Sequence, residues 1–536
     1  MPGRSRREYP AVTTTLGRNS TAAPYRRFSW QEAIVDYLPP HRQTTRAYTW
    51  VERLPTIGIL LLTSLLSLRL RNSAFIDEAL YINAGQDYLN SLLHGAAVPD
   101  HGAYFSGVPV LYPVLAAGLD AVGGLYLVRL FSLVCVLITI ILVQDFTHVL
   151  FRSRRSGLLA AAAFSFTGSV IFVGALGTFD ALCILLLALA LWLGVKKSGL
   201  RSAVSIGLVL SLAVSVKYTG AIFVPVVVGL LLLSAVGAWR RAAVASGIFV
   251  MIIAVGLSLF GGTLLPGIEF TTSTRAALSP TSRTQLLIYL VLNIGLLIAL
   301  ALHGARRTAR GGRVVAGSVA LLLLGAVALP AAQVRLGEAV SFDKHTAYAA
   351  LFLAPLAGLG LASMSRGILK LAPVGLTLLL ALIAGVSRSG ALYAGWVPLE
   401  PVLSTMGRTP PAGLYLSSAA DSLKYYSRKP NPNVRWQTTF ALYSAGSDQI
   451  QRAVNTNRFQ MIIFRSGATG SSQQDSGQRV LAQAVNDNPR YQLVREPFAV
   501  QSYSADRWFV YRLTATVPSS GYGSDSKATA TTGTRP

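Results

Sequence analysis

The sequence is poor in charged residues, which make up only 13% of its 536 positions. Soluble globular domains usually carry about 25%. In contrast, 52% of the residues are hydrophobic and the mean hydropathy is +0.50. Several apolar runs approach the ~20 residues that a helix needs to cross a bilayer. Because such runs recur along most of the chain, they are not one cleavable signal peptide. The composition therefore predicts a polytopic α-helical membrane protein.

Cysteine and acidic residues are also scarce. Cys135 and Cys183, the two cysteines, both lie in apolar runs, so we interpret them as small buried hydrophobes and not as a disulfide framework. Only 22 acids face 47 Lys and Arg, which gives a net charge of +25. The basic residues form short clusters between apolar runs, and no basic–aromatic module occurs, so no nucleic-acid partner is expected. Walker, dinucleotide-binding, zinc-finger and lipase motifs are absent from the sequence.

About eleven apolar segments qualify as candidate membrane spans. They lie near 54–70, 122–143, 157–175, 180–195, 202–216, 219–238, 243–265, 286–303, 314–332, 346–363 and 371–387. If the N-terminus is cytoplasmic, the short inner loops, such as "FRSRRS" and "HGARRTARGGR", are all basic, as the positive-inside rule requires. We therefore predict a multi-pass protein of the plasma membrane with a cytoplasmic N-terminus and an extracytoplasmic C-terminal region.

Shifts in composition divide the chain into four parts. They are a basic cytoplasmic arm (1–53), a transmembrane domain (54–387) with a long first outer loop (71–121), an extracytoplasmic domain (388–514) and a Ser/Thr/Gly-rich disordered tail (515–536). In the third part, strand-like segments such as "FQMIIFRSG" alternate with helix-like ones such as "QDSGQRVLAQAVND". This alternation predicts a small α/β domain.

The first outer loop is not a polar tether. Leu80, Ala84, Tyr88 and Leu92 recur near helical spacing, so we expect an amphipathic helix along the outer membrane surface. Asp77 and Glu78 directly precede this pattern. Taken alone, the pair is best explained as a helix cap, because acids stabilise a helix N-terminus.

The two acids can have separate roles, because neighbouring residues point about 100° apart on a helix. One would face a cavity while the other pairs with a cation. Five more ionisable residues lie at or inside the outer ends of predicted spans: Arg129, Asp180, Lys217, Lys344 and His345. An intramembrane ionisable residue is a functional hypothesis, although a long side chain can also reach interfacial water.

Carboxylates and cations on one outer side suit sugar transfer from a phosphate-linked donor. A carboxylate would take the proton of the acceptor hydroxyl, and cations would stabilise the departing phosphate. Nucleotide sugars are not supplied outside the cytoplasm, so a lipid-phosphate donor is expected. The rival hypothesis is a transporter or lipid flippase, which would also place polar residues within spans. A single outward site holding Asp77, Asp180, Lys217 and Lys344 would favour the transferase.

Five segments in order resemble the GT-C glycosyltransferases, specifically protein O-mannosyltransferases and aminoarabinose transferases (glycosyltransferase family 39-like). They are "FIDEALYINAGQDYL", "GVPVLYPVLAAGLDAVGGLYLVRLFSLV", "GTFDALCILLLALALWL", "GLVLSLAVSVKYTGAIFVPVV" and "DKHTAYAALFLAPLAGLG". The resemblance covers roughly residues 54–387. It implies an inverting transferase that uses a polyprenyl-phosphate sugar, with a protein, lipid or cell-wall glycan as acceptor.

The resemblance also implies roles for individual residues. Asp77 matches the family's catalytic base, Glu78 matches a partner acid that orients the site or the acceptor, and Asp180 matches the second outer-loop acid. Some relatives use a divalent metal ion and others do not, so metal dependence stays open. His94 and His101 could supply ligands together with Glu269, but their spacing defines no site.

The cationic residues match basic positions of the family. Arg129, Lys217 and Lys344 would bind the lipid phosphate or pair with Glu78. His345 departs from the pattern, because relatives often carry Arg or another residue near this position, so its role is open.

Overall fold

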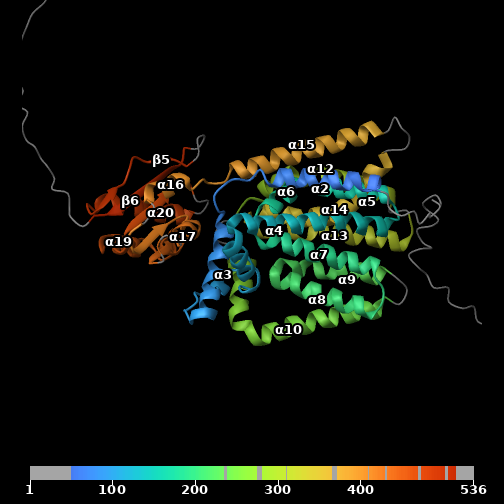
Figure 1. Cartoon of the computed structure of the whole chain (residues 1–536), viewed down its shortest axis with the longest axis horizontal. Coiled ribbons are helices and arrows are strands. Elements are labelled where there is room, and N and C mark those ends of the chain that lie inside the picture. The colour runs from blue at the N-terminus through green and yellow to red at the C-terminus, as the bar shows by residue number, and fades with distance from the viewer. Residues whose placement is uncertain are drawn as a thin grey trace, which may run out of the picture.

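The computed structural model describes residues 50–514 except 235–237, 275–280, 309–310, 365–370, 408–409, 429–430, 432, 469–471 and 501–504. The predicted basic arm, apart from residues 50–53, and the predicted tail 515–536 lie outside the described residues. The described chain forms a bundle of long helices with a mixed α/β domain at one end (Figure 1).

The bundle is built from apolar helices, since a chain in lipid must satisfy its backbone hydrogen bonds within each segment. In chain order its elements are α2 (Trp50–Ser67), α3 (Ile76–His94), η1 (His101–Ala103), α4 (Leu111–Phe151), α5 (Arg154–Ser165), α6 (Gly168–Ala175), α7 (Phe179–Lys196), α8 (Leu200–Val216), η2 (Tyr218–Phe223), α9 (Val224–Leu233), α10 (Trp239–Glu269), η3 (Phe270–Thr274), α12 (Arg283–Thr308), α13 (Arg313–Leu336), α14 (Phe342–Met364) and α15 (Leu371–Ala394). Each predicted span overlaps one or two of these elements.

Fewer helices than predicted are long enough to span a bilayer alone. Within the described residues seven are, or eight if α5 and α6, which are bent by 67°, form one broken span. Helix α8 and the η2–α9 segment are shorter apolar pieces. The count of about eleven spans thus stays a prediction.

Two predicted borders differ from those of the helices in the structure. Helix α4 already begins at Leu111, inside the predicted loop, and its non-helical residues Gly123 and Gly124 form a kink near the expected border. Helix α15 continues to Ala394, beyond the domain border predicted at 388. In α3 the buried residues lie mainly in the first half, whereas Leu92 near its C-terminal end is 82% exposed. The location of this helix along the membrane surface stays a prediction.

Helix α14 lies at the centre of the bundle and is the most deeply buried of the candidate spans. It packs against α12, α13 and α5. A Cβ atom at Gly304 of α12 would lie 2.0 Å from the carbonyl oxygen of Leu356 in α14, so only glycine allows this approach of the two backbones. The N-terminus of α14, which carries Lys344 and His345, is also buried.

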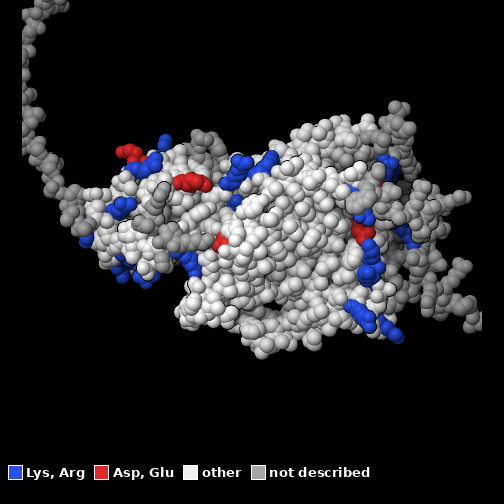
Figure 2. Space-filling model, viewed as in Figure 1, with Lys and Arg blue, Asp and Glu red and all other residues white. Residues whose placement is uncertain are grey.

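The surface of the bundle agrees with a membrane location. Figure 2 shows a broad belt without charged side chains on the visible face, with Lys and Arg side chains on both sides of it, at the end away from the α/β domain and next to that domain. Large apolar side chains, such as Leu61 and Leu259, are exposed on the helices. Exposed apolar surface of this extent fits contact with lipid.

The C-terminal region contains α16 (Glu400–Met406), β1 (Gly413–Ser417), α17 (Ala420–Ser427), β2 (Val434–Thr438), α18 (Thr439–Ser444), α19 (Ser447–Asn455), β3 (Met461–Arg465), α20 (Ser472–Asp487), β4 (Tyr491–Leu493), β5 (Phe498–Ala499) and β6 (Arg507–Leu513). The strand order is β2-β1-β3-β6-β4, with β5 pairing to β6. Strands β1, β2 and β3 are parallel, and β6 is antiparallel to its neighbours.

Alternate residues of the sheet face different helices, as the pleat requires. Leu416 of β1 packs with residues of α18, α19 and α20, whereas Tyr415 packs with α16 and α17. Helix α17 also packs against α3 of the bundle. One layer of the α/β domain therefore lies directly on the helix that begins with Asp77 and Glu78.

Candidate active site

Glu78 lies in the first turn of α3, and its side chain is completely buried. Its carboxylate accepts hydrogen bonds from the Phe75 N–H at 2.9 Å, the Gly177 N–H at 2.7 Å, and Nε and Nη2 of Arg129 at 2.9 and 2.7 Å. The bond to Phe75 caps the helix, so the capping interpretation holds for Glu78. Both carboxylate oxygens accept hydrogen bonds, so Glu78 joins the start of α3 to Arg129 of α4 and to Gly177 before α7.

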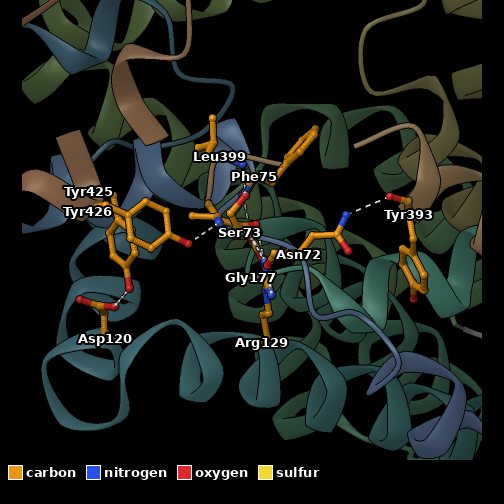
Figure 3. Close-up of polar contacts among 12 residues, drawn as sticks. Asn72, Ser73, Phe75, Asp120, Arg129, Gly177, Tyr393, Leu399, Tyr425 and Tyr426 are labelled. Carbon is orange, nitrogen blue, oxygen red and sulfur yellow. Dashed lines mark hydrogen bonds and ion pairs between the residues drawn. The ribbon is translucent and has the colours of Figure 1, made fainter. Parts of the chain in front are cut away.

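Arg129 uses its remaining donors on the segment that leads into α3. Nη1 donates to the Asn72 carbonyl at 3.0 Å and Nη2 to the Ser73 carbonyl at 3.1 Å (Figure 3). The guanidinium also lies 5.5 Å from the ring centroid of Trp396. A buried cation needs this degree of compensation. Arg129 therefore fixes the position of the loop that precedes the acids.

Gly177 connects this arrangement to the break between α6 and α7. A Cβ atom at this residue would lie 2.8 Å from Cγ1 of Val128, so a larger residue would push the backbone N–H away from Glu78. The short extended stretch around Gly177 also starts α7 so that Asp180 falls in its first turn. The break in the helices thus places a second carboxylate near α3.

A second group of ionised side chains forms a continuous ion-pair chain: Asp77, Lys344, Asp180 and Lys217. Nζ of Lys344 lies 2.5 Å from Oδ2 of Asp77 and 3.7 Å from Oδ2 of Asp180. Lys217 pairs with Oδ1 of Asp180. The side chains of Asp180, Lys217 and Lys344 are at most 5% exposed, whereas that of Asp77 is 26% exposed. Asp77 is therefore the accessible end of the chain.

Helix ends supply all members of this chain. Lys217 lies in an extended conformation between α8 and η2, and Lys344 lies in the first turn of α14. The side chain of Lys217 also lies 5.0 Å from the ring centroid of Phe179. Ends of helices leave room for charged groups that a continuous apolar helix would exclude. The interruption at Lys217, which shortens α8 and α9, is the local origin of this buried pair.

The structure brings all seven predicted site residues to one end of the bundle. Glu78 and Arg129 form one pair, and His345 lies 2.8 Å from Nζ of Lys217 at the end of the ion-pair chain. Sequence reasoning missed Tyr348, whose hydroxyl donates to Oδ1 of Asp180 at 3.2 Å. Its spacing of four residues from Lys344 on one helix face was a signal that could have found it.

Gln333 and Thr178 were also missed. Oε1 of Gln333 lies 2.9 Å from Nδ1 of His345, and Oγ1 of Thr178 donates to Oδ2 of Asp180 at 3.1 Å. Gln333 was visible as an uncharged polar residue in the apolar run "LPAAQVRLG". Nothing in the sequence links it to His345, because the two residues meet only where α13 and α14 pack together.

The α/β domain contacts the segment just before the acids. The Ala74 N–H donates to the hydroxyl of Tyr426 at 2.7 Å, and the Leu399 N–H donates to Oγ of Ser73 at 3.3 Å. Next to it, the hydroxyl of Tyr425 donates to Oδ1 of Asp120 in α4 at 2.6 Å (Figure 3). The position of α3 thus depends on α17 as well as on the bundle.

Asp87 forms the polar centre of this junction. Its carboxylate lies 3.2 Å from Nε2 of His101, 3.1 Å from Nζ of Lys424 and 3.2 Å from Nη1 of Arg428. Burial by itself would raise the pKa of Asp87. The hydrogen bond with His101 and the two cations outweigh burial, so the pKa lies below its ordinary value of 3.8.

Replacing Asp87 by Asn is expected to weaken the attachment of α17 to α3 by about 1–3 kcal/mol, because three donors lose a charged acceptor. A depressed pKa contributes stability above the unfolded value and loses it as the pH falls. The difference from wild type should therefore be full at pH 7 and shrink below pH 3.8.

The measurement is thermal unfolding in detergent, with the rate of proteolytic release of the α/β domain as a second readout. The matched control is Asp448→Asn, which changes an exposed acid in the first turn of α19. Equal loss in the two variants would contradict the role of Asp87.

The potential metal ligands do not converge. His101 is engaged with Asp87 and with the Tyr104 hydroxyl, which lies 2.7 Å from Nδ1, while His94 ends α3 and Glu269 ends α10. In the part of the chain that the structure describes, no group of three or more His, Cys, Asp or Glu side chains is arranged to hold a metal ion. None of the steps below is routed through a metal.

An apolar groove opens on the bundle surface between α12 and α13, with Leu353 of α14 at its floor. Its volume is about 550 Å³, and its walls are mostly leucine, isoleucine, valine and alanine side chains. Arg283 at the start of α12 and Arg335 at the end of α13 belong to its lining and lie at the same end of these antiparallel helices. That end also carries Gln333 and the ion-pair chain.

Part of the chain matches a known protein family. Residues 109–264 match the family of dolichyl-phosphate-mannose-protein mannosyltransferases. The matched segment includes Arg129, Asp180 and Lys217. No curated protein sequence matches the chain.

Solved structures agree over far more of the chain. The structure of ArnT from Cupriavidus metallidurans bound to undecaprenyl phosphate has a TM-score of 0.55 and 13% identity, covering 87% of this chain and 98% of that one. The apo form of the same protein has a TM-score of 0.56 and 14% identity, covering 86% of this chain and 97% of that one. The apo oligosaccharyltransferase of Archaeoglobus fulgidus gives a TM-score of 0.51 and 12% identity, covering 78% of this chain and 70% of that one.

The chain has the GT-C glycosyltransferase fold. This confirms the fold that the sequence resemblance implies. At such low identities the structural likeness concerns the GT-C fold alone and does not assign a donor, an acceptor or the role of any side chain. Those assignments rest on the geometry of the ion-pair chain.

Proposed function

We propose that this chain is a membrane glycosyltransferase that moves a monosaccharide from a polyprenyl-phosphate donor to an acceptor hydroxyl on the outer side of the membrane. The observation that carries the proposal is the arrangement at Asp77. This carboxylate is the accessible member of an otherwise buried ion-pair chain, and it lies against Lys344 at the end of a GT-C bundle. A base and a cation are thus adjacent where sugar transfer needs both.

In the proposed reaction the acceptor O–H gives its proton to the Asp77 carboxylate while the oxygen attacks the anomeric carbon. The bond between that carbon and the phosphate oxygen breaks on the opposite side. Its electron pair leaves with the polyprenyl phosphate. One displacement inverts the configuration of the anomeric carbon.

Lys344 is the cation best placed to stabilise the leaving phosphate, because it directly adjoins Asp77. Lys217 is buried and paired with Asp180, and Arg129, whose side chain is 14% exposed, is paired with the buried Glu78. We therefore assign these two cations to holding the site rather than to binding the phosphate. Glu78 is the organiser of the α3 N-terminus, and Asp77 is the base.

The groove between α12 and α13 is the proposed path of the donor's hydrocarbon chain. It is apolar, its wall residues Leu287 and Val327 are at least 50% exposed on the bundle, and two arginines stand at the end nearest the ion-pair chain. A long apolar groove with two arginines at one end suits a prenyl chain that carries a phosphate. The ArnT structure bound to undecaprenyl phosphate supports the same donor class.

The proposed topology has a cytoplasmic N-terminus and an outer α/β domain. Lys and Arg gather at the bundle end away from that domain (Figure 2), as expected for the cytoplasmic side. The ion-pair chain then faces the outer leaflet. The domain borders proposed from the sequence remain 54–387 for the catalytic part and 388–514 for the outer part, with α15 crossing the border.

The test is to incubate membranes containing the chain with a panel of radiolabelled monosaccharides, each linked to the same polyprenyl phosphate. We expect at least one donor to transfer its label from the polyprenyl phosphate to another molecule. Identifying that labelled product identifies the acceptor. Membranes without the chain are the control. Labelled donor that crosses the bilayer unchanged, with no product from any sugar, would instead favour the flippase.

A further inference from the structure

The amide of Gln333 has a fixed orientation. Its Nε2 lies 3.1 Å from the carbonyl oxygen of Val340 and 3.4 Å from that of Glu338. Carbonyl oxygens only accept hydrogen bonds, so the NH₂ group must face them. The amide oxygen of Gln333 is then the atom that lies 2.9 Å from Nδ1 of His345.

This orientation determines the protonation of His345. Because an amide oxygen only accepts, Nδ1 of His345 carries a hydrogen and donates it to Gln333. The other ring nitrogen, Nε2, lies 2.8 Å from Nζ of Lys217. An ammonium group has no acceptor, so Nε2 must hold a free electron pair. The surroundings select the neutral imidazole with its hydrogen on Nδ1.

Lys217 thereby has two acceptors on different helices, Asp180 of α7 and His345 of α14. Asp180 also receives the hydroxyl hydrogen of Tyr348. All these side chains are buried, so water does not substitute for a lost partner. Together they join the backbone carbonyl of Val340, on the turn between α13 and α14, to the ion-pair chain that ends at Asp77.

Resting on the proposed function, we propose that His345 is a positioning residue that acts as a neutral acceptor for Lys217. By holding Lys217 on Asp180, it keeps that carboxylate neutralised. Lys344, which is 3.7 Å from Asp180 and 2.5 Å from Asp77, then stays with Asp77. Without the acceptor, Lys217 shifts, Asp180 attracts Lys344, and the base and its cation separate. His345 therefore sets the geometry of a reaction in which it does not touch the reacting atoms.

Two substitutions of His345 distinguish the roles of its two ring nitrogens. The amide of Gln reaches the position of Nε2, so His345→Gln keeps an acceptor for Lys217, whereas the shorter His345→Asn reaches only the position of Nδ1. We expect His345→Gln to keep kcat within about threefold of wild type and His345→Asn to lower kcat by roughly tenfold or more, with KM for the donor little changed in both. Restoration by Gln but not by Asn is not expected of a residue that only fills space.

Gln333→Glu is the third variant. Its carboxylate faces the Nδ1 hydrogen and favours the protonated imidazole, which would place a second donor against Lys217. Its kcat should fall as that of His345→Asn does. If Gln and Asn at position 345 lose kcat equally, or both match wild type, the positioning role is refuted. Losses that follow the melting temperature of each variant in detergent would also refute it.

A spectroscopic arm separates this inference from the proposed function. In protein labelled with ¹⁵N-histidine, His345 is assigned by the signal that disappears in His345→Gln. One protonated Nδ1 and one unprotonated Nε2 signal are expected at neutral pH. Two protonated signals, or the opposite tautomer, would refute the inference even if sugar transfer is observed. The expected pair of signals without transfer from any donor would count against the function alone.

Discussion

Asp77→Asn is expected to abolish measurable sugar transfer while the protein stays folded in the membrane. The amide keeps the shape of the side chain but cannot accept the acceptor's proton. Loss of a general base typically costs about 10²–10⁴ in rate. The side chain is 26% exposed, so its replacement leaves no buried cavity.

The partner of Asp77 also explains why folding should survive. Lys344 loses its nearest carboxylate in this variant, but Asp180 lies only 3.7 Å away. The buried ammonium therefore keeps an acidic partner, and the penalty for an unpaired buried charge is avoided.

The measurement is transfer of label from the active donor of the panel, in membranes with equal amounts of wild type and variant. The matched control is Asp100→Asn, the same substitution at an exposed acid of the same outer loop. Undiminished transfer by Asp77→Asn would remove Asp77 as the base. Equal loss in the control would point to the loop as a whole.

The gathering of the site could be predicted from the sequence because membrane topology restricts where charges can lie. Once the basic clusters set the inner side, Asp77, Asp180, Lys217 and Lys344 had to fall at the same end of the bundle. Their partners could not be predicted. The pairing of Lys344 with Asp77, 267 positions apart, depends on how α14 packs against its neighbours.

The contacts of the α/β domain with the bundle could not be predicted from the sequence for a different reason. Alternating strand and helix signals indicate a small mixed domain, but they do not say which face meets the bundle. The contacts of Tyr426 and Lys424 with the first outer loop come from a short helix, α17, whose sequence "ADSLKYYS" carries no recognisable binding signal. The α/β domain thus shapes the segment that leads to Asp77, the proposed base.

Glu78→Gln is expected to differ from Asp77→Asn in its effect on stability. In the wild type both oxygens of Glu78 accept hydrogen bonds. In the variant, the NH₂ group of the amide faces donors instead, and Arg129 keeps its charge with no acid to balance it. Breaking a buried pair from one side costs about 3–5 kcal/mol. We therefore expect a large loss of stability, measured by SDS-induced unfolding in mixed micelles, together with loss of activity.

The double variant Glu78→Gln/Arg129→Met distinguishes the pair from the individual residues. Removing both charges takes away the unbalanced cation, so stability should recover in part relative to Glu78→Gln alone. Activity should not recover, because without Arg129 the carbonyls of Asn72 and Ser73 lose the donors that hold the segment before α3. A Glu78→Gln variant as stable as wild type would show that the buried pair does not hold α3 in place. The partly exposed Asp77 and the completely buried Glu78 would then not differ in their effect on stability.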